Sequence, residues 1–283
     1  MSYVRHSVVL CFFTMICWGS WANTQKLSPK SWSFTLFYWD YSIGVLLFSL
    51  FIGLTFGSFG EDGRPLIDDL FQADKASFVS AFFGGVIFNL ANLLIVAAIS
   101  IAGMSVAFPV GIGIALILGV LVNYIATPVG NPILLFFGVF LIGLAIILDA
   151  LAYKFQAGKN KKSSTMGIII SVIGGILMGL FYRFVASSMS SNFTNPEDGL
   201  FTPYSAILIF STGIFISNFL FILLKLAVRS LSKSGAKPLD ADIFPRVISY
   251  KPLLCSEILF AVLIKNSNSD EILSDVFIGF LFI

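Results

Sequence analysis

The sequence predicts an all-α protein that crosses a membrane several times, and two observations support this prediction. Of its 283 residues, 57% are apolar and only 11% are charged, whereas soluble domains have about 45–50% apolar and about 25% charged residues. Apolar runs without any charge recur along the chain, and one of them extends from Ala76 to Leu148. Too few charges remain to cover a soluble enzyme, and the net charge of +2 gives no indication of a nucleic-acid partner.

Seven segments are long and apolar enough to cross a bilayer. A membrane-spanning helix needs about 20 such residues, so the longest run must turn back twice. Gly103 with Pro109, and then the stretch Thr127–Pro132, provide the breaks, because proline lacks a backbone donor and disfavours helix in the residue before it. Beyond residue 224 charges interrupt each apolar stretch, and we expect no eighth span. The expected spans are residues 7–25, 34–60, 76–100, 104–125, 133–153, 163–182 and 199–224.

The first segment follows Arg5, as the apolar core of a signal peptide would. No small-x-small cleavage pattern follows it, so we interpret it as a membrane span. Lys and Arg in short loops stay on the cytoplasmic side of a membrane. The loops after the first, fifth and seventh spans are basic and those after the second and sixth are acidic, which predicts an N-terminus on the outer side.

The cysteine and histidine content excludes several kinds of chemistry. Three cysteines, two of them in the first apolar run, provide neither a disulfide framework nor a Cys-x-x-Cys metal site. His6 is the single histidine, so Ser-His-Asp, Cys-His and His-Glu-x-x-His sites are excluded. We therefore expect no catalytic residues, no metal and no cofactor.

Small residues recur every four positions in two of the expected spans. Such residues let helix backbones approach closely in lipid, where the surroundings are as apolar as the helices themselves. We interpret both stripes as packing faces, and the polar residues that end them as the sharper functional signal. The stripes are Gly111, Ala115, Gly119 and Asn123 in the fourth span, and Gly167, Ser171, Gly175, Gly179 and Arg183 in the sixth.

Charged side chains inside the spans are a second kind of candidate. An ionisable group within a membrane costs about 2.5–3.5 kcal/mol on insertion scales, and such groups generally face a cavity or a partner. Asp40 in the second span and Arg183 in the outer third of the sixth meet this description. Asp149 lies within one turn of the interface and is less informative. Asp40 is the candidate for proton coupling.

Uncharged polar side chains add a third kind of candidate. Asn89 and Asn92 lie three residues apart on one face of the third expected span and form an amide patch near mid-membrane. Two interpretations stay open for them, namely binding of a polar solute and hydrogen bonding between helices. Trp18, Trp21 and Asn23 of the first span are further candidates, although aromatic residues there also suit an interfacial belt.

Several motifs of five or more residues carry a resemblance to a known family. They are Cys17–Asn23, Phe37–Tyr41, Gly84–Asn92, Ser105–Gly113, Pro128–Pro132 and Leu200–Tyr204. Through them, residues 7–235 resemble the ureide permease-like proteins of the drug/metabolite transporter superfamily. These motifs are longer and more specific than a single Gly-x-x-x-Gly. The central loop, residues 154–166, lacks the nucleotide-loop-like motif of the plant members, so nothing suggests use of ATP.

The resemblance implies ten helices in two inverted five-helix halves, with a solute site between the halves and transport by alternating access. On this basis residues 1–153 form the first repeat, 154–166 form a basic cytoplasmic loop, and 167–237 hold the first two helices of the second repeat. About seven of the ten expected spans are then present. Residues 238–283 depart from the pattern, and we hypothesise a truncated or altered tail.

The expected function is secondary transport of a small polar solute, such as a ureide, a nucleobase-like metabolite or a sugar, across a plasma membrane or bacterial inner membrane. Lipid surrounds the protein, and a proton is the candidate coupling ion. Two alternatives stay open, a seven-helix receptor with its N-terminus outside and a nonfunctional transporter fragment. The residues expected around the solute path are Trp18, Trp21, Asn23, Asn89, Asn92, Tyr182 and Arg183.

Overall fold

The structure of the protein is a computed structural model. It describes Ile16 and residues 34–59, 63–128, 130–156, 165–192 and 195–231. The first expected span lies outside the described residues except for Ile16, and the tail from residue 238 lies outside them entirely. Trp18, Trp21 and Asn23 therefore stay predictions from the sequence.

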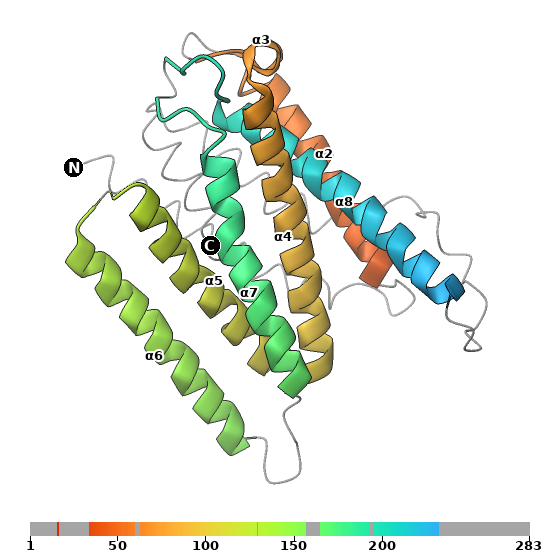
Figure 1. Cartoon of the computed structure of the whole chain (residues 1–283), viewed down its shortest axis with the longest axis vertical. Coiled ribbons are helices and arrows are strands. Elements are labelled where there is room, and N and C mark those ends of the chain that lie inside the picture. Colours follow the sequence, from red (N-terminus) through yellow and green to blue (C-terminus); the bar gives the residue numbers. More distant parts are fainter. Residues whose placement is uncertain are drawn as a thin grey trace. The chain divides into compact units, whose positions relative to one another are not determined.

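The described residues are almost entirely helical (Figure 1). An isolated bridge between Met189 and Phe201 is the one β-type pairing among them. Five helical stretches are long and apolar enough to span a membrane, and Tyr38–Leu54 is a shorter apolar helix. These findings confirm the predicted class, an all-α multi-pass membrane protein. The helices are α2 (Phe34–Leu54), α3 (Leu66–Gln72), α4 (Lys75–Ala102), α5 (Met104–Ala126), α6 (Pro132–Gln156), α7 (Thr165–Ala186) and α8 (Pro203–Leu231).

Glycines lie at two of the reversals of the chain, whereas one proline that was predicted to help break a helix does not. Gly103 separates α4 from α5 with a φ of 88°, and Gly130 lies between α5 and α6 with a φ of 93°. Only glycine adopts such angles without strain. Pro109 was expected to help break the chain, but it lies inside α5. Gly103 alone therefore ends α4, and α5 continues through the proline.

Two compact units divide the chain. One contains the described residues of Met1–Phe82 and Ser188–Leu281, and the other contains Phe83–Ser187. Helix α4 is continuous and contributes its first turns to one unit and the rest to the other. The predicted repeats of residues 1–153 and 167–237 concern internal symmetry, and they stay predictions.

In the unit of residues 83–187, α7 packs closely against α5 through the two predicted glycine stripes. A Cβ atom at Gly175 would press on the carbonyl oxygen of Gly111, and one at Gly179 would lie 3.0 Å from the carbonyl oxygen of Ala115. Ser171 Oγ donates a hydrogen bond to the carbonyl oxygen of Ala107. The two stripes therefore face each other along parallel helices, which confirms their interpretation as packing faces.

Helix α7 also packs against α4, in the antiparallel direction. A Cβ atom at Gly174 would lie 3.3 Å from the carbonyl oxygen of Ala91, and one at Gly84 would meet the side chain of Val185. Phe88 and Phe181 meet edge to face with ring centroids 5.0 Å apart. Small side chains thus let both α4 and α5 approach α7, because no bulky group separates the backbones.

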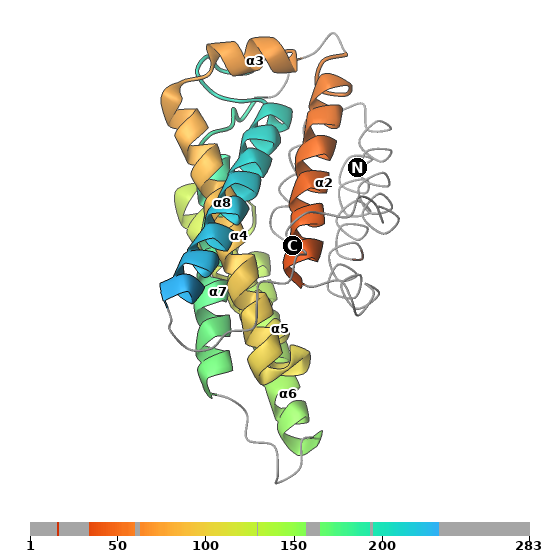
Figure 2. The same ribbon diagram turned by 90° about the vertical axis from the view of Figure 1, so that its right-hand side faces the viewer.

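In the other unit, α2 and α8 run antiparallel to each other. Trp39 meets Phe215 and Phe219 edge to face, with ring centroids 5.7 Å and 5.9 Å apart. A Cβ atom at Gly57 would meet the side chain of Tyr204, near the opposite end of this pair. The short helix α3 lies at the end of this unit where α8 begins, and it contacts α8 (Figure 2). It was not expected from the sequence, because its seven residues include two aspartates and form no span.

Candidate functional site

The two amides expected to face a solute are both buried in α4. Asn89 is fully buried and Asn92 is 7% exposed, and both lie near the middle of this 28-residue helix. Ala91 and Ile95, which contact α7 at Gly174, occupy the neighbouring face. The amides therefore flank the tightly packed α4–α7 seam, at a depth where amide donors and acceptors are out of reach of bulk water.

Tyr182 and Arg183, adjacent in the last turn of α7, have opposite surroundings. Tyr182 is buried, whereas Arg183 is exposed. Successive residues of a helix point about 100° apart, so neighbours in sequence need not share a face. A cation in this last turn also suits the negative end of the helix dipole. The structure therefore places Arg183 at the surface of the described chain, at the end of α7.

Asp40 lies in the second turn of α2 and is half-buried. The ring of buried Tyr38 packs 5.4 Å from that of Tyr41 on the same helix. Asp40 lies between these two tyrosines in the sequence, near the end of α2 that the loop charges predict to be the inner one. Its candidate role in proton coupling stays a prediction.

A polar seam between α2 and α8 was missed from the sequence. Asn218 is 2% exposed, and its amide nitrogen donates to Ser42 Oγ at 3.2 Å and to the carbonyl oxygen of Tyr38 at 3.5 Å. Ser49 and Ser211 lie seven residues from Ser42 and Asn218 and are buried too. Ser211 Oγ has no hydrogen-bond partner among the described residues. The seven-residue spacing of polar groups in these apolar helices could have indicated the seam from the sequence.

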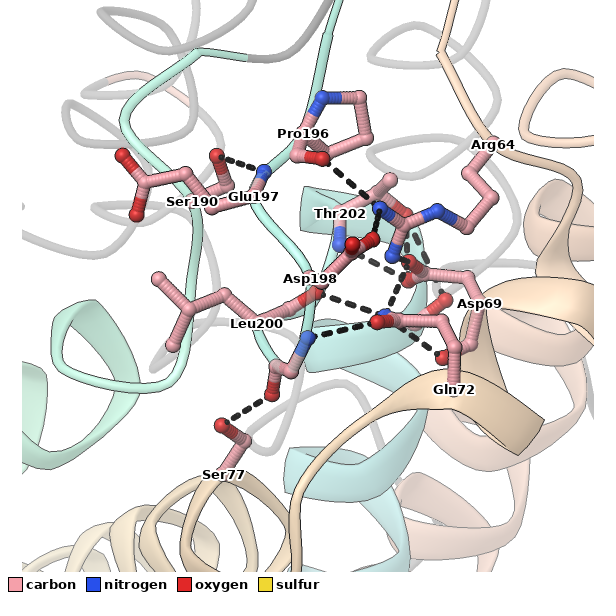
Figure 3. Close-up of polar contacts among 12 residues, drawn as sticks. Arg64, Asp69, Gln72, Ser77, Ser190, Pro196, Glu197, Asp198, Leu200 and Thr202 are labelled. Atoms are coloured by element: carbon pink, nitrogen blue, oxygen red, sulfur yellow. Dashed lines mark hydrogen bonds and ion pairs between the residues drawn. The ribbon is translucent and has the colours of Figure 1, made fainter.

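A second polar cluster joins two loops at the end where α3 lies (Figure 3). Its centre is Asp69, whose side chain is fully buried. One oxygen of Asp69 accepts hydrogen bonds from the backbone N–H and hydroxyl of Thr202, at 2.8 Å and 3.0 Å. The other accepts from Arg64 and from the Gln72 amide, both at 3.2 Å. The carboxylate is thus surrounded by four donors.

Arg64 and Gln72 extend this cluster to the segment 196–200. The Arg64 guanidinium donates to the Pro196 carbonyl at 2.7 Å and pairs with Asp198 at 3.2 Å. Gln72 accepts a bond from the Gly199 N–H at 2.7 Å and donates to the Leu200 carbonyl at 2.9 Å. Two segments far apart in sequence are thereby joined, mainly by side chains of residues 64–72.

These contacts give the polar cluster around Asp69 a structural role. A buried carboxylate is stable only when its lost hydration is replaced by hydrogen bonds and an opposite charge, and Asp69 has both. In the sequence, the acidic residues of this loop were used only to predict the orientation of the chain in the membrane, and they did not predict this cluster. No group of three or more His, Cys, Asp or Glu side chains among the described residues is arranged to hold a metal ion.

The geometry defines a class of protein, a multi-pass α-helical membrane protein with amides and hydroxyls buried within its spans. Residues 37–163 match the family model described as ureide permease. The chain is similar to three proteins of Arabidopsis thaliana. Ureide permease 2 is 31% identical over 128 residues, which cover 44% of this chain and 32% of the relative. Ureide permease 1 is 25% identical over 157 residues (55% and 40%), and ureide permease 5 is 28% identical over 165 residues (56% and 40%).

These matches show that part of the chain is similar to ureide permeases. The matched segment extends from α2 past the end of α6, and it contains both Asn89 and Asn92. The chain spans about a third to two fifths of the length of these relatives. No solved structure matches the chain.

Proposed function

We propose that this chain functions in secondary transport of a small polar solute of the ureide type. The family match and the multi-pass helical architecture support a transporter rather than an enzyme. The relatives are named ureide permeases, and a solute rich in amide-like N–H and C=O groups suits a site built from amides and hydroxyls. A nucleobase-like metabolite or a sugar presents comparable groups and is the alternative solute class.

The observation that carries the proposal is the burial of Asn89 and Asn92 in the matched segment. Each amide supplies two donors and an acceptor oxygen, so together they can pair with the alternating N–H and C=O groups of a ureide. Polar groups inside a span are costly and mark solute pathways. Both amides lie on a helix whose neighbouring face is packed against α7, so they are held on a rigid support.

The remaining expected residues have separate proposed roles. Tyr182 contributes a buried phenol next to the aromatic contact of Phe181 with α4. Arg183 is exposed, and we assign it to attraction of the solute at the entrance rather than to the buried part of the path. Asp40 is the proposed carrier of a coupling proton. Trp18, Trp21 and Asn23 are proposed to line the path from the first span.

Uptake by the purified protein in proteoliposomes tests the proposal. A radiolabelled ureide, a nucleobase and a sugar are offered in turn, and we expect accumulation of the ureide. Asn89→Ala and Asn92→Ala should each weaken apparent affinity by roughly fivefold or more, because a hydrogen bond contributes about 1 kcal/mol.

Asn131→Ala is the matched control. Asn131 is exposed and its side-chain oxygen accepts a hydrogen bond from the Ile133 N–H at 2.9 Å; it is not among the residues expected around the solute path, so uptake should be unchanged. Equal effects of all three variants would show that the amides contribute only to folding. Absence of uptake for every solute, with correctly inserted protein, would contradict the proposed transport.

A further inference from the structure

Helix α3 presents an apolar surface to its surroundings. Ile67 is 56% exposed and Phe71 is 89% exposed, and the two are four residues apart on one side of the helix. Phe59 is 80% exposed and follows Ser58, whose hydroxyl accepts a hydrogen bond from the Leu66 N–H at 3.2 Å. Large apolar groups are therefore exposed along the segment that joins α2 to α4.

The orientation of α3 about its own axis is determined by contacts on its other side. Leu66 is buried and packs at Gly53, and Leu70 packs against the core cluster that contains Phe201. The Asp69 carboxylate holds Thr202 through two hydrogen bonds. Rotation that would bury Phe71 would also break these contacts, so the apolar side stays outward.

The exposed apolar residues and the exposed charge of α3 lie on different flanks of the helix. At 3.6 residues per turn, Ile67 and Phe71 lie roughly 110° and roughly 150° from the direction midway among Leu66, Asp69 and Leu70. The exposed Asp68 lies roughly 150° from that direction on the other side. One flank is thus apolar, while the charge lies on the other.

Helix α3 lies close in the chain to a stretch that is long and apolar enough to span a membrane. Only Ala73 and Asp74 separate α3 from Lys75, which is exposed and begins the apolar stretch Lys75–Ile99. Helices with an apolar side and a charged side lie in the interface between lipid headgroups and acyl chains, where aromatic residues concentrate and Lys reaches the headgroups.

We propose that α3 is an interfacial helix whose Ile67–Phe71 flank inserts among the lipid headgroups on the outer side of the membrane. Lipid fits this surface better than a protein, because two or three side chains fall far short of the roughly 800 Å² per partner in a stable protein interface. The contact would position the Arg64–Asp69 cluster at the membrane surface. The proposal does not depend on the transported solute.

Spin labels on the full chain in phosphatidylcholine vesicles test this placement. Cys11, Cys17 and Cys255 are replaced by Ser, and single cysteines are introduced as Ile67→Cys, Phe71→Cys and, as the matched control, Asp68→Cys. Collisions of each nitroxide with oxygen, which concentrates in lipid, are compared with collisions with a water-soluble nickel complex. Labels at 67 and 71 should favour oxygen at least severalfold more than the label at 68.

Two results would overturn the proposal. Equal or greater access of the nickel complex to position 71 than to position 68 would place the flank in water. Low access of both reagents to position 71 would show that protein, either a second copy or another segment, covers it. Circular dichroism and elution volume identical to those of the unlabelled chain verify that each variant is folded, since all three positions are exposed.

Discussion

Asp69 illustrates how one residue can hold two distant loops together. Its carboxylate receives donors from Arg64 and Gln72 on its own side and from Thr202 at the start of α8. The arginine side chain is itself only 18% exposed, so the pair is screened less than a surface ion pair. Sequence alone showed an acidic loop, and a buried acid cannot be told from an exposed one by composition.

Replacing Asp69 by Asn should destabilise the protein by about 2–4 kcal/mol. The change removes the negative charge opposite Arg64, and the amide replaces one acceptor oxygen by a donor that faces the groups of the cluster. Thermal unfolding of the detergent-solubilised protein measures the loss. Asp68→Asn is the control, because Asp68 is exposed one residue away and should change stability by no more than about 0.5 kcal/mol. Similar losses in both variants would contradict the assigned role of the cluster.

Among helices, the pairing of α7 with α5 follows from a pattern visible in the sequence. Small residues at four-residue intervals indicated two packing faces, and the structure shows that they meet each other. Which two faces would meet was not predictable, because every small-residue stripe offers the same flat surface. The additional contact of α7 with α4, through Gly174 and Gly84, could be identified only from the structure.

A methyl group added between α7 and α5 should separate these two helices. Gly175→Ala places a Cβ atom against the carbonyl oxygen of Gly111, and overpacking of this kind costs about 1–3 kcal/mol. Gly138→Ala in α6 is the matched control, since a Cβ atom there would meet nothing within 4 Å. That variant should be neutral or slightly more stable, because Ala favours helix over Gly. Unfolding in detergent compares the two, and an equal response would show that the seam is not close-packed.

At the scale of the whole molecule, the charges of the loops predict its orientation in the membrane. Basic loops and acidic loops alternate along the sequence, and the segment that contains exposed Glu197 is expected outside. From the sequence, residues 154–166, which include Lys161, are expected inside. The fold agrees with an alternation of ends, since α5 and α7 run parallel to each other with α6 between them in the chain.

An impermeant maleimide applied to intact cells tests this orientation. With the three native cysteines replaced by Ser, Glu197→Cys should be labelled and Lys161→Cys should not, because the reagent cannot cross the bilayer. Labelling after permeabilisation is the control and should reach both positions. The reverse pattern in intact cells would invert the predicted topology.

By itself, the sequence determined that this chain belongs in a membrane as a bundle of helices, where most of those helices lie, and which small-residue faces pack. Such properties follow from local composition and from the helical period, which neighbouring residues carry within one segment. It also singled out Asn89 and Asn92, which the structure shows to be buried, while their role around the solute stays a prediction. Tertiary structure alone decided that Pro109 continues a helix, that Tyr182 is buried while Arg183 is exposed, and that Asn218 meets Ser42. Those features depend on contacts between segments far apart in the chain, and no local pattern specifies which segments will meet.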